Sequence, residues 1–146
     1  MVEAKDLRIG NIVDRKYFNP NPKNPKQEIE PCYVVGLLDL ARVSLDLKGR
    51  DVLKCDYELL EPIPLTKEWI IKFGFSDKGY KDGYIAKDFG SGGIILDFVL
   101  TKPFVKGEWQ KHYAFDFAEH RFVQFEFVHE LQNFFYCAAR EDLQII

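Results

Sequence analysis

The sequence has few cysteines and no long apolar run. Its three cysteines, Cys32, Cys55 and Cys137, are an odd number and have no C-x-x-C spacing. Disulfide frameworks and zinc sites need paired or clustered cysteines, so we expect reduced, buried thiols in a reducing compartment. No stretch approaches the roughly 18 apolar residues of a membrane span, and the charged residues 1–6 contain no apolar signal core. These absences predict a cytoplasmic protein without a membrane segment.

The motifs that usually identify an enzyme are missing too. The histidines His112, His120 and His129 match neither H-E-x-x-H nor a zinc-finger spacing, and G-x-S-x-G does not occur. Residues 90–93 are rich in glycine but lack the lysine and the hydroxyl residue of a P-loop, so they predict a flexible hairpin turn. The sequence therefore indicates no catalytic residue, no metal ligand and no cofactor. It favours a non-catalytic protein over an enzyme whose site is assembled only in the fold.

Positive and negative charges nearly balance, so the net charge is small. The net charge is -3 and the pI is about 5.6. Residues 1–63 hold ten basic and eleven acidic residues (10 − 11 = −1), and residues 64–146 hold ten and twelve (10 − 12 = −2). Neither half is basic, which argues against a general nucleic-acid coat protein. Hydrophobic residues make up 47% of the chain and aromatics 15%, so the chain has enough core material to fold.

The first half of the chain has the pattern of short strands. We expect strands at residues 7–13, 32–38, 41–47 and 51–55, a tight turn at 57–60, and a last short strand that ends at Pro62. Gly10 and Asn11 are expected to form a turn or bulge in the first strand. The alternation is strict in residues 41–47, where Val43, Leu45 and Leu47 share a face. Several short strands with a long first loop predict a small SH3-like β-barrel over residues 1–63.

The long first loop holds the best candidate for a contact with a partner. Three Asn-Pro pairs in residues 18–26 predict an extended loop at a hairpin tip. Basic and aromatic residues gather around it: Arg15, Lys16, Tyr17, Phe18, Lys23 and Lys26. Such a mixture can hold phosphates and stack bases. The alternative, a solvated loop with two aromatic anchors at its base, is favoured because the surrounding half is slightly acidic.

A short helix is expected between the two halves, at residues 67–73. Pro62 and Pro64 end the preceding strand. Thr66 is placed to cap the free amides of the first turn, and Glu68 suits the positive end of the helix dipole. Leu65 and Ile70 have the spacing of a hydrophobic staple.

The end of this helix is marked as clearly as its start. Gly74 supplies a residue for the left-handed conformation, and Phe75 is placed to fold back on Ile70 in a Schellman closure. Trp69, Ile70 and Phe73 form one apolar face. Because so short a helix is unstable alone, we expect this face to be docked.

The second half, residues 64–146, alternates between strand and helix patterns. Strands are expected at residues 84–87, 94–100, 109–117 and 121–127, with a turn at 119–120. The period then changes, because Val128, Leu131, Phe134, Phe135 and Ala138 follow helical spacing. This stripe predicts a final helix over residues 128–139 with its aromatic side on the sheet.

Three blocks of the sequence carry a resemblance to a known family. They are residues 7–11, residues 60–69 with 72–75, and residues 128–133 with Phe135. In this order they resemble a family of small uncharacterised proteins that is common in Bacteroidetes, often in phage, prophage or mobile-element settings. The resemblance implies no activity and no cofactor, and we interpret the blocks as architecture. Members often end the last helix with a glycine, where Arg140 stands here.

These observations predict an α+β protein in two parts. An SH3-like β-barrel (residues 1–63) leads through the short helix into an antiparallel sheet packed by the C-terminal helix (residues 64–146). The function that they favour is a non-catalytic accessory protein of a phage or mobile element that binds an unknown protein. The alternative is nucleic-acid binding through the barrel and its basic loop. No membrane partner is expected.

Overall fold

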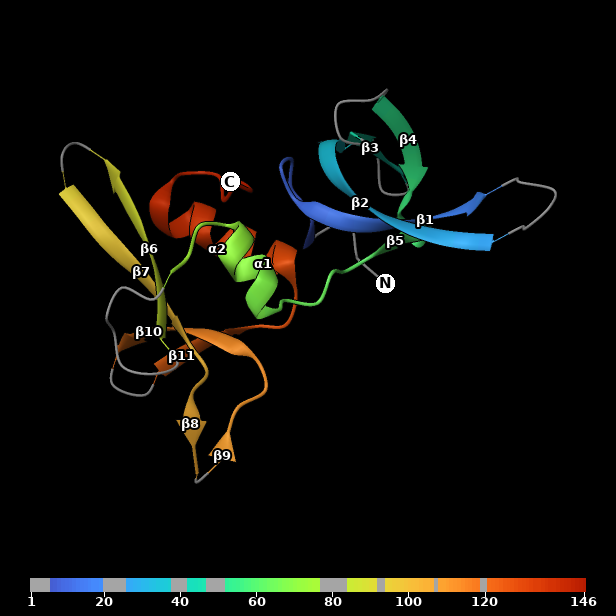
Figure 1. Ribbon diagram of the computed structural model, residues 1–146. Coiled ribbons are helices and arrows are strands. Elements are labelled where there is room, and N and C mark those ends of the chain that lie inside the picture. Colours follow the sequence, from blue (N-terminus) through green and yellow to red (C-terminus); the bar gives the residue numbers. More distant parts are fainter. Residues whose placement is uncertain are drawn as a thin grey trace. The chain divides into compact units, whose positions relative to one another are not determined.

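The computed structural model describes residues 6–19, 26–37, 42–46, 52–76, 84–91, 94–106, 108–118 and 121–146. The chain divides into two compact units. Unit 1 comprises residues 1–63 and 127–133, and unit 2 comprises residues 64–126 and 134–146. The predicted α+β class is confirmed, with two main antiparallel sheets and two helices (Figure 1). Neither of these helices is long and apolar enough to cross a membrane.

Unit 1 is built on a five-stranded antiparallel sheet. Its strands are β1 (Ile12–Asn19), β2 (Lys26–Leu37), β3 (Arg42–Asp46), β4 (Val52–Asp56) and β5 (Leu60–Glu61), in the order β4-β3-β2-β1-β5. A 3-10 helix, Tyr57–Leu59, connects β4 to β5. The expected closed barrel is not confirmed, because the described residues form an open sheet with β4 and β5 at its edges.

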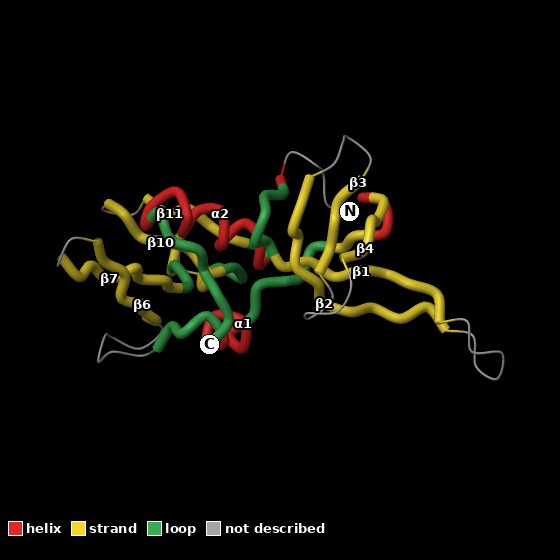
Figure 2. The backbone as a smooth tube through the Cα atoms, turned by 90° about the horizontal axis from the view of Figure 1, so that it is seen from above, coloured by secondary structure: helices red, strands yellow, loops and turns green. Residues whose placement is uncertain are grey.

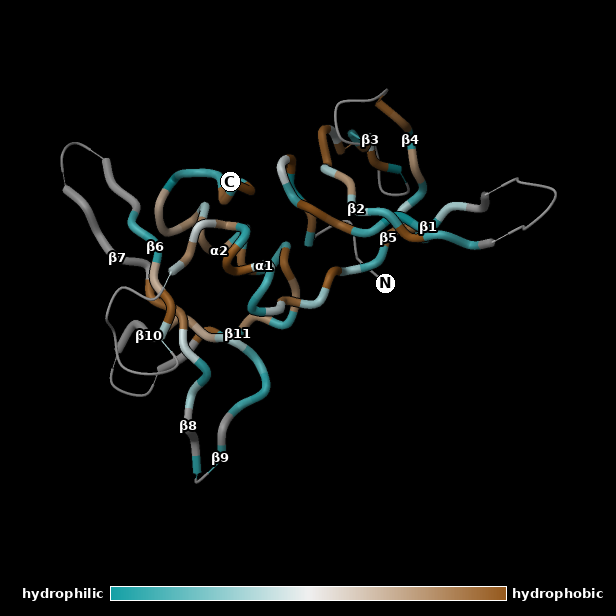
Figure 3. Tube along the Cα trace, in the orientation of Figure 1, coloured by the Kyte–Doolittle hydropathy of each residue, from teal (hydrophilic) through white to brown (hydrophobic). Residues whose placement is uncertain are grey.

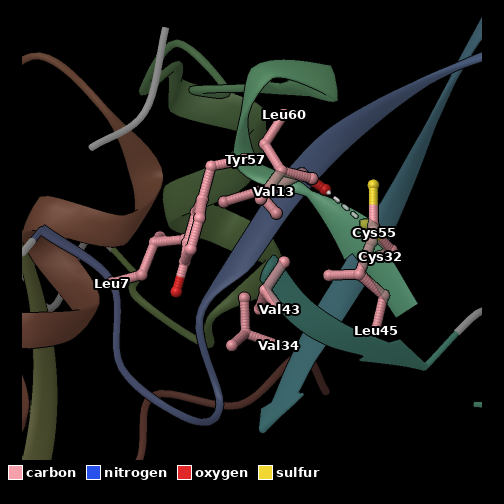
Figure 4. Packing of buried hydrophobic residues seen from close by; sticks show 9 residues of the cluster. All are labelled: Leu7, Val13, Cys32, Val34, Val43, Leu45, Cys55, Tyr57 and Leu60. Atoms are coloured by element: carbon pink, nitrogen blue, oxygen red, sulfur yellow. Dashed lines mark hydrogen bonds between the residues drawn. The ribbon is translucent and has the colours of Figure 1, made fainter. Parts of the chain in front are cut away.

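The core of unit 1 follows from the alternation of these strands. Val34 lies opposite Leu45, and Val43 lies opposite Cys55, so these side chains share one face of the sheet. Figure 4 shows this cluster: Leu7, Val13, Cys32, Val34, Val43, Leu45, Cys55, Tyr57 and Leu60. Each of them is buried, which places the apolar half of the alternating pattern in the interior.

The first strand begins later than the sequence predicted. Gly10 has a φ of 94°, and the Asn11 N–H donates to the carbonyl of Arg8 at 3.2 Å, so residues 8–11 form a turn. Strand β1 starts only at Ile12 and then continues to Asn19, through residues that were expected to lie in the loop. Residues 20–25, with Lys23, lie outside the described part of the chain.

The first half of helix α2 (Val128–Ala139) is joined to this turn by the side-chain amide of Gln132. Its Oε1 accepts a hydrogen bond from the Ile12 N–H at 2.9 Å, and its Nε2 donates to the Gly10 carbonyl at 3.1 Å. Gln132 is 1% exposed. Its amide therefore satisfies the buried Ile12 N–H and the partly buried Gly10 carbonyl.

The neighbouring Asn133 extends this contact. Its Oδ1 accepts from Asn11 Nδ2 at 2.9 Å, and its Nδ2 donates to the Asp6 carbonyl at 2.8 Å. We call the hydrogen bonds of Gln132 and Asn133 to residues 6–12 the clamp. They join residues 7–11 to residues 128–133, which are the first and last of the three blocks that carry the resemblance.

Unit 2 contains the second sheet. Its strands are β6 (Tyr84–Ser91), β7 (Ile94–Thr101), β10 (Tyr113–Ala118) and β11 (Arg121–Phe125), in the order β11-β10-β7-β6. A separate two-stranded pair, β8 (Phe104–Val105) and β9 (Glu108–Trp109), was not expected from the sequence. Gly92, Gly93 and the turn at 119–120 lie outside the described residues.

Helix α1 (Lys67–Lys72) ends in the predicted Schellman closure. The Phe75 N–H donates to the Ile70 carbonyl at 3.3 Å, and the Gly74 N–H donates to the Ile71 carbonyl at 2.8 Å. Gly74 has a φ of 81°. Ile70 and Phe73 are buried and Trp69 is half-buried, so the expected docking is confirmed for Ile70 and Phe73 and is partial for Trp69.

The start of α1 differs from the prediction. Thr66 occupies the N-cap position, but its side chain makes no capping hydrogen bond. Its hydroxyl bonds the Glu68 carboxylate instead, and this bond is the main reason that the pKa of Glu68 is lowered. The Thr66 hydroxyl thus donates to a carboxylate two residues inside the helix, and its oxygen accepts no hydrogen bond from a first-turn amide.

Helix α2 has the bounds that its apolar stripe predicted. Glu130 Oε2 accepts from the Phe127 N–H at 3.1 Å, which is the back-bond of a capping box. In unit 2, the Phe134 ring lies 5.4 Å from that of Phe115 and 5.3 Å from that of Phe125. The aromatic side of this helix therefore packs on β10 and β11.

Candidate functional site

The predicted contact residues that the structure describes, all but Lys23, lie on a two-stranded arm of unit 1. Figure 2 shows β1 and β2 continuing side by side beyond the other strands of this unit, and their pairing runs to Asn19 opposite Lys26. Arg15, Lys16 and Tyr17 are in β1. Phe18 and Lys26 are also in these strands, but their side chains lie outside the described part.

One face of the arm carries a ladder of cross-strand polar pairs. Arg15 lies opposite Glu30, and Tyr17 lies opposite Glu28. Arg15 Nη2 donates to Glu30 Oε1 at 2.6 Å, and the Tyr17 hydroxyl donates to Glu28 Oε2 at 2.5 Å. The Arg15 guanidinium also lies 4.9 Å from the centre of the Tyr17 ring. The hydrogen bond to Glu28 raises the pKa of Tyr17.

On the other face of the arm, the charge of Lys16 is neutralised by a carboxylate. Its Nζ forms an ion pair with Glu61 of β5. Asp14 lies directly opposite Glu61, and its pKa is raised by burial and then by the Glu61 charge. Both cations whose side chains are described in the arm are thus engaged by carboxylates of the same sheet.

Counted from the sequence, the arm region carries almost no net charge. Residues 14–30 contain four basic residues and three acidic ones (4 − 3 = +1), and Glu61 brings the sum to 0. Binding to phosphates is driven by net positive charge and counterion release. The arm therefore offers little electrostatic attraction for a nucleic acid.

A second surface of unit 1 lies along the edge strand β4. Among the described residues, β4 pairs with β3 and with no other strand. Val52 is 64% exposed and Leu53 is 38% exposed; Figure 3 colours this beginning of the strand as hydrophobic. Exposed apolar side chains on an edge strand are uncommon, because such an edge can pair with another chain.

Sequence reasoning identified this strand but not its exposed edge. Leu53 lies opposite Leu45 on the core face, whereas Val52 lies opposite Asp46 on the other face. Adjacent residues of a strand point to opposite faces. If only one face of a short strand is covered, one of two consecutive apolar residues must face solvent. The pair Val52-Leu53 was therefore the sequence pattern that could have predicted this exposed edge.

The cysteines have the environment of core residues in unit 1. The Cys32 thiol donates to the Val13 carbonyl at 3.3 Å, and burial raises the pKa of Cys32 to about 12. Burial also raises the pKa of Cys55. Such thiols stay protonated and are poor nucleophiles. Cys137, on α2, is exposed.

Within the described ranges, no group of three or more His, Cys, Asp or Glu side chains is placed to hold a metal ion. Comparison of the chain with protein-family models, curated proteins and solved structures found no match.

Proposed function

We propose that this chain is a protein-binding accessory protein and that unit 1 receives an extended segment of its partner as an additional strand beside β4. The observation that supports this proposal is an edge of β4 with which no other described strand pairs, combined with the exposed side chains of Val52 and Leu53. An edge strand presents backbone N–H and C=O groups that an incoming strand can bond. The same strand would remove both apolar side chains from water.

The charged residues of β4 limit which partner strands can pair with it. Lys54 and Asp56 are exposed on β4. A second copy that paired antiparallel about Lys54 would place two lysines opposite each other, which is destabilising. A different protein with an acidic residue at that position is the better partner.

Nucleic-acid binding through the arm is the alternative, and the pairing of Arg15 and Lys16 with carboxylates disfavours it. A salt-dependent gel shift with short DNA and RNA tests this alternative. If the double change Lys16→Glu and Lys23→Glu abolished a shift shown by the wild type, the arm would bind nucleic acid and our preference would be wrong.

We also propose a more specific fold for unit 1 and a biological source for the protein. The strand order with a 3-10 helix before β5 supports an SH3-like fold for unit 1 in which the described sheet stays open at β4. The resemblance carried by the three sequence blocks supports a cytoplasmic accessory protein of a phage or mobile element. Such barrels bind different kinds of partner, so the fold itself does not choose one.

The experiment compares two lysine substitutions at exposed apolar positions. Val52→Lys blocks the edge of β4, and Leu59→Lys, in the 3-10 helix, is the matched control because Leu59 is 44% exposed. Tagged full-length proteins are used to capture partners from a nuclease-treated lysate of the native host. The recovered protein is then purified and its affinity measured. We expect V52K to weaken binding at least about tenfold and L59K to change it little.

Strand addition also predicts a signature in hydrogen exchange. Backbone amides of β4 should become protected when the purified partner binds. Equal affinity of V52K and wild type, or a complex in which β4 amides exchange as fast as in the free protein, would contradict the proposal.

A further inference from the structure

We propose that His129 makes the clamp sensitive to acid: uptake of a proton by its imidazole opens the contact between the start of α2 and the turn at residues 8–11. This inference is independent of the proposed function, since it concerns the opposite end of β1 from the arm and does not involve β4.

The first observation is the burial of His129. Its side chain is 4% exposed, and Nδ1 is buried without a hydrogen-bond partner among the described residues. The ring stacks almost parallel on Phe127, with an interplanar angle of 7° and a centroid distance of 5.8 Å. A protonated imidazole has two N–H donors to satisfy, so the cation would be buried here with an unmade hydrogen bond.

The second observation is the position of His129 in the helix. It is the second residue of α2, where the unpaired N–H groups of the first turn create the positive end of the helix dipole. A cation is disfavoured at this end. Among the described residues, the charged groups that act on the imidazole are Glu130 on the same helix and Asp6 on the N-terminal segment, and both favour protonation. Burial outweighs them and lowers the pKa of His129.

The third observation connects this residue to the clamp. Gln132 stands three residues after His129, which places the two side chains on one side of the helix. Gln132 holds the Ile12 N–H and the Gly10 carbonyl. If the first turn of α2 moves to bring the imidazole into water, Gln132 moves with it and these two hydrogen bonds are lost.

The sign of the pH effect follows from linkage. In the open form the imidazole is in water and has its ordinary pKa of 6.5, whereas in the closed form its pKa is lower. Below pH 6.5 the open form binds more protons, so acid favours opening. The opening equilibrium should rise by up to about tenfold per pH unit until the closed form is also protonated.

The test measures hydrogen exchange of the Ile12 amide in the full chain between pH 7.5 and 5, after correction for the intrinsic rate at each pH. In the wild type we expect the opening constant to rise toward about tenfold per pH unit below pH 6.5. His129→Gln should make it almost independent of pH. His112→Gln, at a half-buried position in unit 2, should behave as the wild type does. The same steep slope in H129Q, or no slope in the wild type, would refute the proposal.

A second measurement uses the unaltered chain and decides the matter if H129Q does not fold. Nitrogen NMR of the His129 imidazole should show a titration midpoint below 6.5, with the Ile12 amide changing over the same pH range. A midpoint at or above 6.5, or an Ile12 amide that does not respond, would overturn the inference.

Discussion

Gln132 supplies Ile12 with a hydrogen-bond acceptor from 120 residues away in the sequence: its Oε1 lies 2.9 Å from the Ile12 nitrogen. The same side-chain amide donates to Gly10, so one residue satisfies the backbone on both sides of Asn11.

Replacing Gln132 by alanine should therefore be costly. The buried Ile12 N–H and the partly buried Gly10 carbonyl lose their partner. A cavity also forms, so we expect the free energy of unfolding to fall by about 2–4 kcal/mol. Urea unfolding followed by circular dichroism measures this loss. Gln124→Ala, at an exposed position of β11, is the control and should change stability by less than about 0.5 kcal/mol. A similar small change for both variants would show that the clamp contributes little.

Arg140 offers a stabilising substitution. It has a φ of 59° just after α2, a conformation that costs a residue with a Cβ about 1 kcal/mol and costs glycine almost nothing. Its N–H bond to the Tyr136 carbonyl, 2.8 Å, is a backbone bond that glycine keeps. We expect Arg140→Gly to raise the thermal midpoint. Ala139→Gly, one residue earlier and inside the helix, should lower it. A lower midpoint for R140G would mean that the arginine side chain contributes more than its backbone strain costs.

Gly74 should show the opposite preference. Its φ is 81°, and a Cβ there would lie 2.8 Å from Lys87 Nζ and 3.0 Å from Ile146 Cδ1. The lysine end can move away, so most of the cost comes from the backbone. We expect Gly74→Ala to destabilise the chain by about 1 kcal/mol. Gly74→Asn should cost less, because asparagine tolerates the left-handed conformation better than alanine does. Chemical unfolding of the two variants side by side checks this order; if asparagine proved the worse of the two, steric contact would outweigh backbone strain.

Asp14 predicts a pH dependence opposite in sign to that of His129. Its pKa in the folded chain is raised above the ordinary 3.8 by burial and by Glu61. The unfolded chain therefore releases this proton first as the pH rises. Stability is lost between pH 3.8 and the folded pKa, and is fully present below 3.8. Asp14→Asn removes this loss, so the variant should gain stability relative to wild type across that window and keep a constant advantage above it. Unfolding curves of the two proteins that stay parallel from pH 3 to pH 7 would contradict the raised pKa.

Local features of the fold were accessible from the sequence. The stripe from Val128 to Ala138 gave the bounds of α2, and the Gly74–Phe75 pair gave the end of α1. In both cases the deciding interactions lie within a few residues of each other, so spacing and backbone preference are enough to predict them.

Features that depend on distant residues were not accessible. A turn or bulge at Gly10 and Asn11 was expected, but strand β1 begins only after this turn. The Gly10 carbonyl and the Asn11 side chain are held there by Gln132 and Asn133. The basic residues Arg15 and Lys16 suggested a phosphate contact, but pairing with Glu30 and Glu61 cancels their charge. Such pairings arise from strand register, which the sequence of one strand does not contain.

The assignment of residues 127–133 to unit 1 has a consequence for how the chain folds as it is made. A ribosome adds roughly 5–20 residues per second, so Gln132 is synthesised roughly 6–24 s after Ile12. During that interval the Ile12 N–H and the Gly10 carbonyl lack the hydrogen bonds that Gln132 makes with them in the folded chain. We expect chaperones to meet unit 1 in this incomplete state, and its final structure to form only after the last helix has left the exit tunnel.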